Sequence, residues 1–355
     1  MKKNILTLFL GLITLVSCTQ DKHTEIKTLC LRDDIGNYVI KWEINPSFKE
    51  GIVKMYVSDD PNQFGYSDPA GYIDINDGVT TYITNDNVTR KYFKLIFNNQ
   101  FVRVLGPRNI NMDRINNFRD IGGYQPNSFD KKQTQWGKVF RSGSLININC
   151  IDSLRLANLK LRTIIDLRTN KEKTLYPIEY DETNVVNLPI KNPFYKDIIK
   201  NIRAGKMLKG DINVMLQNHY LCFIDNNQNE LGAALRVFLN PKNYPILMMD
   251  SFGKDRVGVL SALLLYALGI PTETINHDYI LSNEYIKKQD FAYLVRGAST
   301  EKQEALTTFL SVKEQYINLT FRYIKRKYGS IDRYLVNQLE FTPDLQAKLK
   351  DILLK

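Results

Sequence analysis

A buried strand, a tight loop and an apolar helix follow one another without interruption in residues 244–268, and this succession constrains the fold more than any other feature of the chain. Residues 244–249 are almost wholly apolar, which is typical of a parallel strand covered on both faces. Residues 257–268 predict an apolar helix that ends at Gly269 and Pro271. A loop between such elements points backbone N–H groups at one place, beside the positive end of the helix dipole. The sequence therefore predicts an anion-binding loop within an α/β domain.

The side chains of this loop partly suit a bound anion. Gly253 and Gly258 permit a tight backbone path. Arg256 can place a bidentate fork on two oxygens of a phosphate. Asp250 is the exception, because its carboxylate would accept the N–H bonds itself, pair with Arg256 and repel a phosphate. Each pair of like charges ~4 Å apart costs about 4 kcal/mol at an effective dielectric of about 20.

Alternating strands and helices extend this domain over residues 113–355. We expect further strands at 139–141 and 161–167, and helices at 151–158, 272–293, 301–327, 331–339 and 342–354. Thr342 can cap the last helix, and Pro343 takes its first position. The pattern predicts an α/β domain with a helical C-terminal part.

The loop resembles the phosphate-binding loop of the bacterial tyrosine phosphatases with the pattern His-Cys-x-Ala-Gly-Lys-Asp-Arg-Thr-Gly. Further segments agree with that family in the family's order: 117–124, 139–145, 165–172, 278–283 and 327–335. The resemblance covers residues 113–355 and implies the fold of a cysteine-dependent tyrosine phosphatase. The loop departs from the pattern where Met249 replaces histidine, Asp250 cysteine, Phe252 alanine and Val257 threonine.

The resemblance also implies residue roles. In the family a cysteine thiolate attacks phosphorus, an arginine binds the equatorial oxygens and an acid protonates the leaving group. Asp250 stands at the nucleophile position, Arg256 at the phosphate-binding position and Asp255 at the general-acid position. Lys254 would suit a second negative charge on the ligand, such as that of a phosphoinositide. The phosphate loop is completed by Ser251, Phe252, Gly253, Lys254, Val257 and Gly258. We expect Arg119, Asp120, Arg141, Asp166 and Arg168 to form a buried ionic network that fixes the loops.

Because a carboxylate is a poor substitute for a thiolate, three functions stay open. The favoured one is a pseudophosphatase that acts as a binding module. The second is an altered phosphotransferase that forms an acyl phosphate on Asp250. The third is an active phosphatase that hydrolyses phosphate monoesters with another nucleophile. Against it, Cys222 lies in an apolar segment and is expected to be a small core residue, and His219 and His277 are expected to be ordinary surface or core histidines. A phosphorylated protein or phosphoester is the expected ligand, and neither a cofactor nor a metal is expected.

The N-terminus has the pattern of a bacterial lipoprotein signal. A positive start precedes an apolar run over residues 5–16, which is too short to span a bilayer. Leu15-Val16-Ser17-Cys18 resembles the lipobox. We therefore expect residues 1–17 to be removed, Cys18 to be lipidated, and the chain to be anchored to an envelope membrane. Thr19 after the cysteine favours the outer membrane, and residues 18–25 would be a tether.

Residues 26–107 predict an all-β module. Short segments rich in β-branched and aromatic residues lie at 26–31, 38–44, 52–57, 80–83, 92–97 and 101–105, with turns between them. This spacing is typical of an antiparallel sandwich and resembles immunoglobulin or fibronectin type III modules, in which Trp42 would be a core residue. The sequence leaves open whether the module binds a glycan or only spaces the second domain from the membrane.

The formal net charge is +10, and removal of residues 1–17, with two lysines and no acid, would leave +10 − 2 = +8. A basic balance favours anionic partners such as phosphate esters, acidic glycans or lipid headgroups. No long block of Lys and Arg is present, so nucleic acid is not an expected partner. Apart from Cys18, the chain has three cysteines, Cys30, Cys150 and Cys222, and we predict no disulfide from their spacing.

Overall fold

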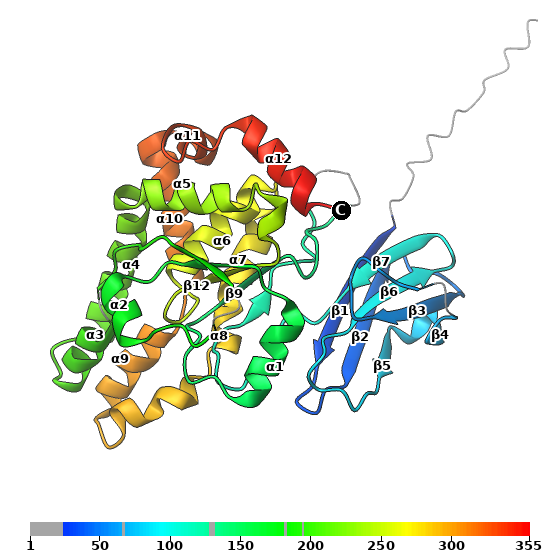
Figure 1. Ribbon diagram of the computed structural model, residues 1–355, viewed down its shortest axis with the longest axis horizontal. Helices are drawn as coiled ribbons and strands as arrows, with labels where there is room; N and C mark the ends of the chain where they lie inside the picture. Colours follow the sequence, from blue (N-terminus) through cyan, green and yellow to red (C-terminus); the bar gives the residue numbers. More distant parts are fainter. Residues whose placement is uncertain (1–23, 66–67, 128–131, 181–182, 194) are drawn as a thin grey trace, which may run out of the picture.

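The structure is a computed structural model that describes residues 24–65, 68–127, 132–180, 183–193 and 195–355. An N-terminal β region lies beside a larger α/β region, and the C-terminus returns to the side that faces the β region (Figure 1). The predicted signal and the lipidated Cys18 lie outside the described residues. No helix among those described is both long and apolar enough to cross a membrane.

The N-terminal β region consists of two antiparallel sheets. Strands β1 (Glu25–Arg32), β2 (Tyr38–Asn45) and β5 (Val79–Tyr82) form one sheet, and β4 (Gly71–Asp74), β3 (Ile52–Ser58), β6 (Tyr92–Phe97) and β7 (Phe101–Leu105) form the other, each in that order. The predicted strands are confirmed to within a residue or two at each end. Among the described strands of this region, β4 alone was not predicted, because it has four residues and each of them is at least partly exposed. Trp42 lies in the shared core, as expected, with its indole N–H bonded to the Ile75 carbonyl at 2.8 Å.

The second region has a mixed α/β fold built on a five-stranded sheet. Its order is β11 (Asn184–Asn187), β10 (Thr163–Asp166), β12 (Ile246–Met249), β9 (Val139–Ser142) and β8 (Arg119–Asp120). The first four strands are parallel, and β8 runs antiparallel to β9. Strand β12 lies in the middle and is fully buried, which explains its continuous apolar sequence. The loop that follows β12 therefore begins at the centre of the sheet's carboxyl edge.

Helices surround this sheet (Figure 1). They are α1 (Cys150–Leu159), α2 (Asn170–Leu175), α3 (Tyr195–Arg203), α4 (Lys209–Asn226), α5 (Gln228–Val237), α6 (Arg256–Ala267), α7 (Thr272–Ile280), α8 (Ser282–Tyr285), α9 (Thr300–Leu310), α10 (Glu314–Tyr328), α11 (Ile331–Asn337) and α12 (Pro343–Leu353). Three short 3-10 helices, Ile75–Asp77, Pro241–Asn243 and η3 (Lys288–Val295), complete the elements. Thr342 caps α12 as predicted.

Two predicted helices are wrong because each is interrupted. The helix expected over 301–327 breaks into α9 and α10, where the Asn283 side chain bonds both the N–H and the carbonyl of Val312 at 2.9 Å. These bonds satisfy backbone groups that a continuous helix would pair internally. The helix expected over 272–293 breaks into α7, α8 and η3, where the backbone N–H of Lys287 donates to Asn116 at 2.8 Å. Both interruptions come from side chains of distant segments, which helical periodicity does not register.

Arg90 of the β region joins the two regions. Its guanidinium is 6% exposed and donates to the Asp120 carboxylate at 2.6 Å and to the Pro107 carbonyl at 2.5 Å. Asp120 also accepts the backbone N–H groups of Gly122 and Gly137, each at 2.7 Å. One buried carboxylate thus fixes the first strand of the α/β region and binds the β region to it.

Replacement of Arg90 by alanine is expected to lower the free energy of unfolding by about 3 kcal/mol, because Asp120 would stay buried without its cation. Urea unfolding of the two proteins measures this difference. Arg114→Ala is a matched control, since Arg114 is exposed, and it should change stability by less than about 0.5 kcal/mol. An equal, small effect of both substitutions would show that the Arg90 pair does not hold the regions together.

Candidate phosphate-binding site

The loop between β12 and α6 surrounds the carboxylate of Asp250. One oxygen accepts the backbone N–H groups of Phe252 at 2.8 Å and Gly253 at 2.6 Å, and the other accepts that of Val257 at 3.1 Å. The Asp250 residue is 2% exposed. The N–H groups that the sequence predicted to converge on an anion therefore converge on a side chain of the loop itself.

Backbone carbonyls of the loop are held on its far side. Asn117 donates from its amide to the carbonyls of Phe252 at 3.1 Å and Gly253 at 2.8 Å, and Arg141 donates to the Gly253 carbonyl at 2.8 Å. Because a peptide unit points its N–H opposite to its carbonyl, the bond to the Phe252 carbonyl aims the N–H of Gly253 toward Asp250. Gly253 has φ +68°, and a Cβ there would lie 2.3 Å from the carbonyl carbon of Ser142, so a glycine is required.

Gly258 differs from the expectation of a turn residue. It lies within α6, and a Cβ at this position would lie 3.0 Å from the Tyr279 ring. Its role is close packing of α6 against α7 rather than a special backbone conformation.

Arg256 pairs with the carboxylate of Glu172, which was not among the expected site residues. Its two terminal nitrogens donate to the two oxygens of Glu172 at 2.7 and 2.9 Å, and Arg256 is 2% exposed. Its Nε lies 3.9 Å from Asp250, which is too far for a hydrogen bond. Glu172 belongs to α2, where it forms a capping box with Thr169. The phosphate-binding arginine is thus occupied by a bidentate ion pair.

The pKa of Glu172 reflects this pairing. Burial alone would raise it, but the hydrogen bonds and charge of Arg256 and the hydroxyls of Ser251 and Thr169 outweigh burial and lower the pKa to about 2. Ser251 donates to Glu172 at 2.5 Å. Glu172 therefore stays ionised and is a weak base at neutral pH.

Because the folded pKa of Glu172 lies below its ordinary 4.5, its contribution to stability is full above about pH 5 and is lost as pH falls toward 2. The difference in free energy of unfolding between wild type and Glu172→Gln is expected to shrink by about 2 kcal/mol from pH 7 to pH 3. Urea unfolding at both pH values measures it. Glu273→Gln, at an exposed position, should show a difference that does not vary with pH. A pH-independent difference for Glu172→Gln would contradict the assigned pairing.

Asp255 and Lys254 pair with each other. The Lys254 amine lies 2.7 Å from both oxygens of Asp255 and is fully buried. The hydroxyl of Tyr220, on α4, donates to Asp255 at 2.8 Å and shares a 2.5 Å hydrogen bond with the hydroxyl of Tyr279. Burial raises the pKa of both tyrosines, so they stay protonated. The expected general acid and the expected second phosphate ligand therefore neutralise one another in this structure.

Phe252 fills space at the side of the loop where the family pattern has alanine. Its ring lies 5.5 Å from the Phe291 ring and 5.7 Å from the Phe309 ring, both edge-on. Only 8% of Phe252 is exposed. This substitution joins the loop to η3 and α9 through an aromatic cluster.

The five expected supporting residues are all buried, but they fall into three separate groups. Arg119 and Arg141 share Asp278, at 3.4 and 2.7 Å. Asp120 pairs with Arg90 instead. Asp166 and Arg168 pair with each other at 2.9 Å. Only the first group contacts the phosphate loop, through Arg141.

Several residues of the site were missed or misjudged from sequence. Asn117, Glu172 and Asp278 lie inside the motifs that carry the family resemblance, so position in a motif was the available signal, whereas Tyr220 lies in none of them. Cys222 was expected in the core and is exposed, because α4 turns that face to solvent. His277 is exposed as well. His219 is partly buried, and burial lowers its pKa to about 4.

Comparison with known proteins identifies the family to which the chain belongs. The family model described as tyrosine phosphatase family matches residues 110–355. A Cupriavidus necator protein provisionally named a tyrosine-protein phosphatase is 26% identical over 239 residues, which are 67% of this chain and 86% of that protein. The triple specificity protein phosphatase PtpB of Mycobacterium tuberculosis is 22% identical over 233 residues, which are 56% of this chain and 84% of that protein. Among solved structures, the chain is similar to the core catalytic domain of the PP-IP phosphatase SIW14 from S. cerevisiae. The match has 18% identity and a TM-score of 0.24, and it covers 53% of this chain and 86% of that structure.

Proposed function

Because the chain belongs to the tyrosine phosphatase family, we propose that it is a catalytically impaired member, a pseudophosphatase that acts as a binding module. One observation carries the proposal: the Asp250 carboxylate accepts three N–H bonds inside the loop where the family binds phosphate. An internal carboxylate in this place stands in for the ligand. It also supplies no thiolate with which to form a phosphoenzyme.

Charge around Arg256 supports the same proposal. Two carboxylates, Glu172 and Asp250, lie at 2.7 and 3.9 Å from its guanidinium. An incoming phosphate dianion would meet both negative charges and would have to displace the Glu172 fork before it reached the arginine. A phosphorylated protein or other phosphoester is the ligand class that the family suggests, and we propose that the loop holds its phosphate weakly.

Hydrolysis of an aryl phosphate distinguishes a catalytically impaired protein from an active phosphatase. We expect no turnover above buffer for the wild type. We expect little gain in Asp250→Cys, because the loop also departs from the family pattern at Phe252 and Val257 and because Asp255 is bound to Lys254. Wild-type turnover that Arg256→Ala abolishes would sink the proposal, since contaminating phosphatase would not respond to that substitution.

An active phosphatase with Ser251 as nucleophile is the second candidate. The observation in its favour is the 2.5 Å hydrogen bond that the Ser251 hydroxyl donates to Glu172, the arrangement of a nucleophile and a base. A glutamate with a pKa of about 2 is a weak base, which is why we rank this function lower. Turnover that is lost in Ser251→Ala and kept in Asp250→Asn would favour it over the pseudophosphatase. Turnover lost in Asp250→Asn would instead support an acyl phosphate on Asp250.

We also propose that residues 26–107 form an immunoglobulin-like or fibronectin type III-like module and that Cys18 anchors the chain in the outer membrane. The three-plus-four arrangement of the antiparallel sheets supports the first part. The lipobox pattern supports the second. Metabolic labelling with a fatty acid tests the anchor: Cys18→Ala should lose the label and leave the membrane fraction, and retention of both would contradict it.

A further inference from the structure

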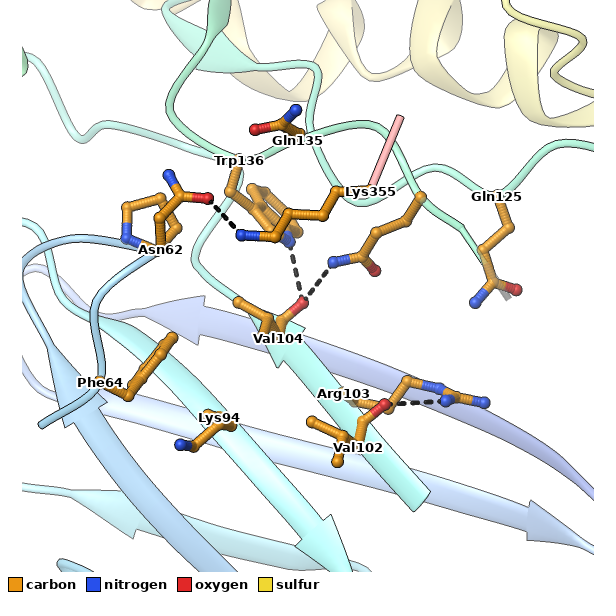
Figure 2. A pocket seen from close by; sticks show the side chains of 12 residues that line it. Asn62, Phe64, Lys94, Val102, Arg103, Val104, Gln125, Gln135, Trp136 and Lys355 are labelled. Atoms are coloured by element: carbon orange, nitrogen blue, oxygen red, sulfur yellow. Dashed lines mark hydrogen bonds between the residues drawn. The ribbon is translucent and has the colours of Figure 1, made fainter. Parts of the chain in front are cut away.

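A hollow of about 380 Å³ lies between the β region and the α/β region (Figure 2). Strands β6 and β7 and the loop after β3 form one wall. The other wall is formed by Gln125, Gln133, Gln135, Trp136 and Lys355. Its volume falls within the roughly 300–1,000 Å³ of small-molecule sites. Nothing in the phosphate loop contributes to it, so this hollow is a separate feature of the protein.

The walls of the hollow are fixed in place. The indole N–H of Trp136 and the side-chain amide of Gln133 both donate to the carbonyl of Val104 on β7, at 3.0 and 2.9 Å. Val104 thereby ties the edge strand of the β region to the α/β region, as Figure 2 shows for Trp136. The bonds use the donor side of the Gln133 amide and leave its oxygen as an acceptor. A preformed, partly closed site results, and ordering it for a ligand costs little.

The charged side chains of the described residues that line the hollow are all basic. Lys94 enters from β6 and Lys355 from the opposite wall (Figure 2), and no acidic side chain is among the described residues that line it. Lys94 lies over the rings of Tyr56 at 4.5 Å and Phe64 at 5.3 Å and forms no ion pair with a described residue. The Lys355 amine donates to the Asn62 side chain at 3.1 Å. Two ammonium groups thus face the same space, and no described residue that lines it brings an acidic side chain to neutralise them.

The remaining lining groups select among anions. Asn62, Gln125 and Gln133 offer amides, which both donate to and accept from hydroxyls. Phe64 and Val102 offer apolar surface for the C–H face of a ring. Arg103 also lines the hollow, where its guanidinium donates to the carbonyls of Val102 at 2.9 Å and Ile26 at 3.4 Å and keeps its other N–H donors for a ligand anion.

From these groups we propose that the hollow binds an acidic saccharide, a sugar that carries a carboxylate or sulfate. The lysines pair with its charge, the amides bind its hydroxyls, and Phe64 and Val102 contact its ring. The site belongs to both regions, so the β region takes part in recognition and is more than a spacer. The proposal does not depend on whether the phosphate loop is active.

Calorimetric titration of the full chain tests the proposal with digalacturonate, a sulfated disaccharide, the neutral disaccharide cellobiose and inorganic phosphate as probes. We expect an acidic disaccharide to bind at least tenfold more tightly than cellobiose or phosphate, and the two acidic probes show which charged group is preferred. Higher salt should weaken the binding severalfold. No binding of either acidic disaccharide, or equal affinity for cellobiose or phosphate, would overturn the proposal.

Substitutions in the lining test whether the saccharide binds in this hollow. Lys94→Gln keeps a polar side chain and should weaken binding at least tenfold, and Val102→Trp, at a half-exposed position, should fill the hollow with the same effect. Lys41→Ala, on the exposed face of β2, is the control and should change affinity less than twofold. Thermal unfolding checks that the variants are folded. Unchanged affinity in folded Lys94→Gln and Val102→Trp would show that the saccharide binds elsewhere.

Discussion

Asp250→Ser is expected to raise the affinity of the loop for inorganic phosphate or tungstate by roughly a thousandfold, because about 4 kcal/mol of like-charge repulsion is removed. The three N–H groups that now bind the Asp250 carboxylate would be released for the anion. Without anion they would be left unpaired in a buried site, which costs about 1–3 kcal/mol. Added phosphate should therefore stabilise the variant strongly and the wild type hardly at all.

Calorimetry measures the affinity for phosphate, and thermal unfolding with and without phosphate measures the stabilisation. Asp250→Glu is the matched control, since it keeps the charge, and it should bind phosphate no better than wild type. Asp250→Ser combined with Arg256→Ala should lose most of the gain, because the fork on the oxygens is then absent. A wild type that already binds phosphate as tightly as Asp250→Ser would contradict the view that Asp250 fills the site.

The loop itself could be predicted because everything that defines it is local. An apolar strand, a tight turn with Gly253 and an apolar helix are adjacent in the sequence, and the direction of their N–H groups follows from backbone geometry. The position of Asp250 at the end of the strand was enough to expect that its carboxylate would accept those groups. The family resemblance then identified the fold, and the α/β arrangement of the structure agrees with it.

What could not be predicted depends on contacts between distant segments. Arg256 and Glu172 are 84 positions apart, and Tyr220 and Asp255 are 35 apart. The sequence suggested which residue types could pair, but not which pairs form, so Asp255 was read as a free acid and Asp120 as part of one network. The hollow between the two regions has the same origin, since its walls are far apart in the chain and meet only after both regions have folded.

Removal of the Asp278 side chain, on α7, is expected to lower the free energy of unfolding strongly. Asp278 pairs with Arg141, which in turn donates to the Gly253 carbonyl of the loop. Asp278 is 1% exposed, lies 3.4 Å from Arg119 and 2.7 Å from Arg141, and also accepts the Tyr124 hydroxyl at 3.0 Å. Burial would raise its pKa, but the two arginines outweigh burial and hold the pKa well below its usual range.

Asp278→Ala leaves two guanidinium groups buried without a counter-charge, and we expect it to lower the free energy of unfolding by more than about 5 kcal/mol, enough to unfold a typical domain. Asp278→Asn keeps the shape of the side chain and one acceptor, so its free energy of unfolding should lie between those of the wild type and Asp278→Ala. The control is Asp332→Ala, where an exposed carboxylate accepts the Tyr266 hydroxyl at 3.1 Å, and a change below about 1 kcal/mol is expected. Urea unfolding and the yield of folded protein measure the series. If Asp278→Ala were as stable as the control, the two arginines would have to find other partners, and the fold of the loop could not depend on this buried pair of contacts.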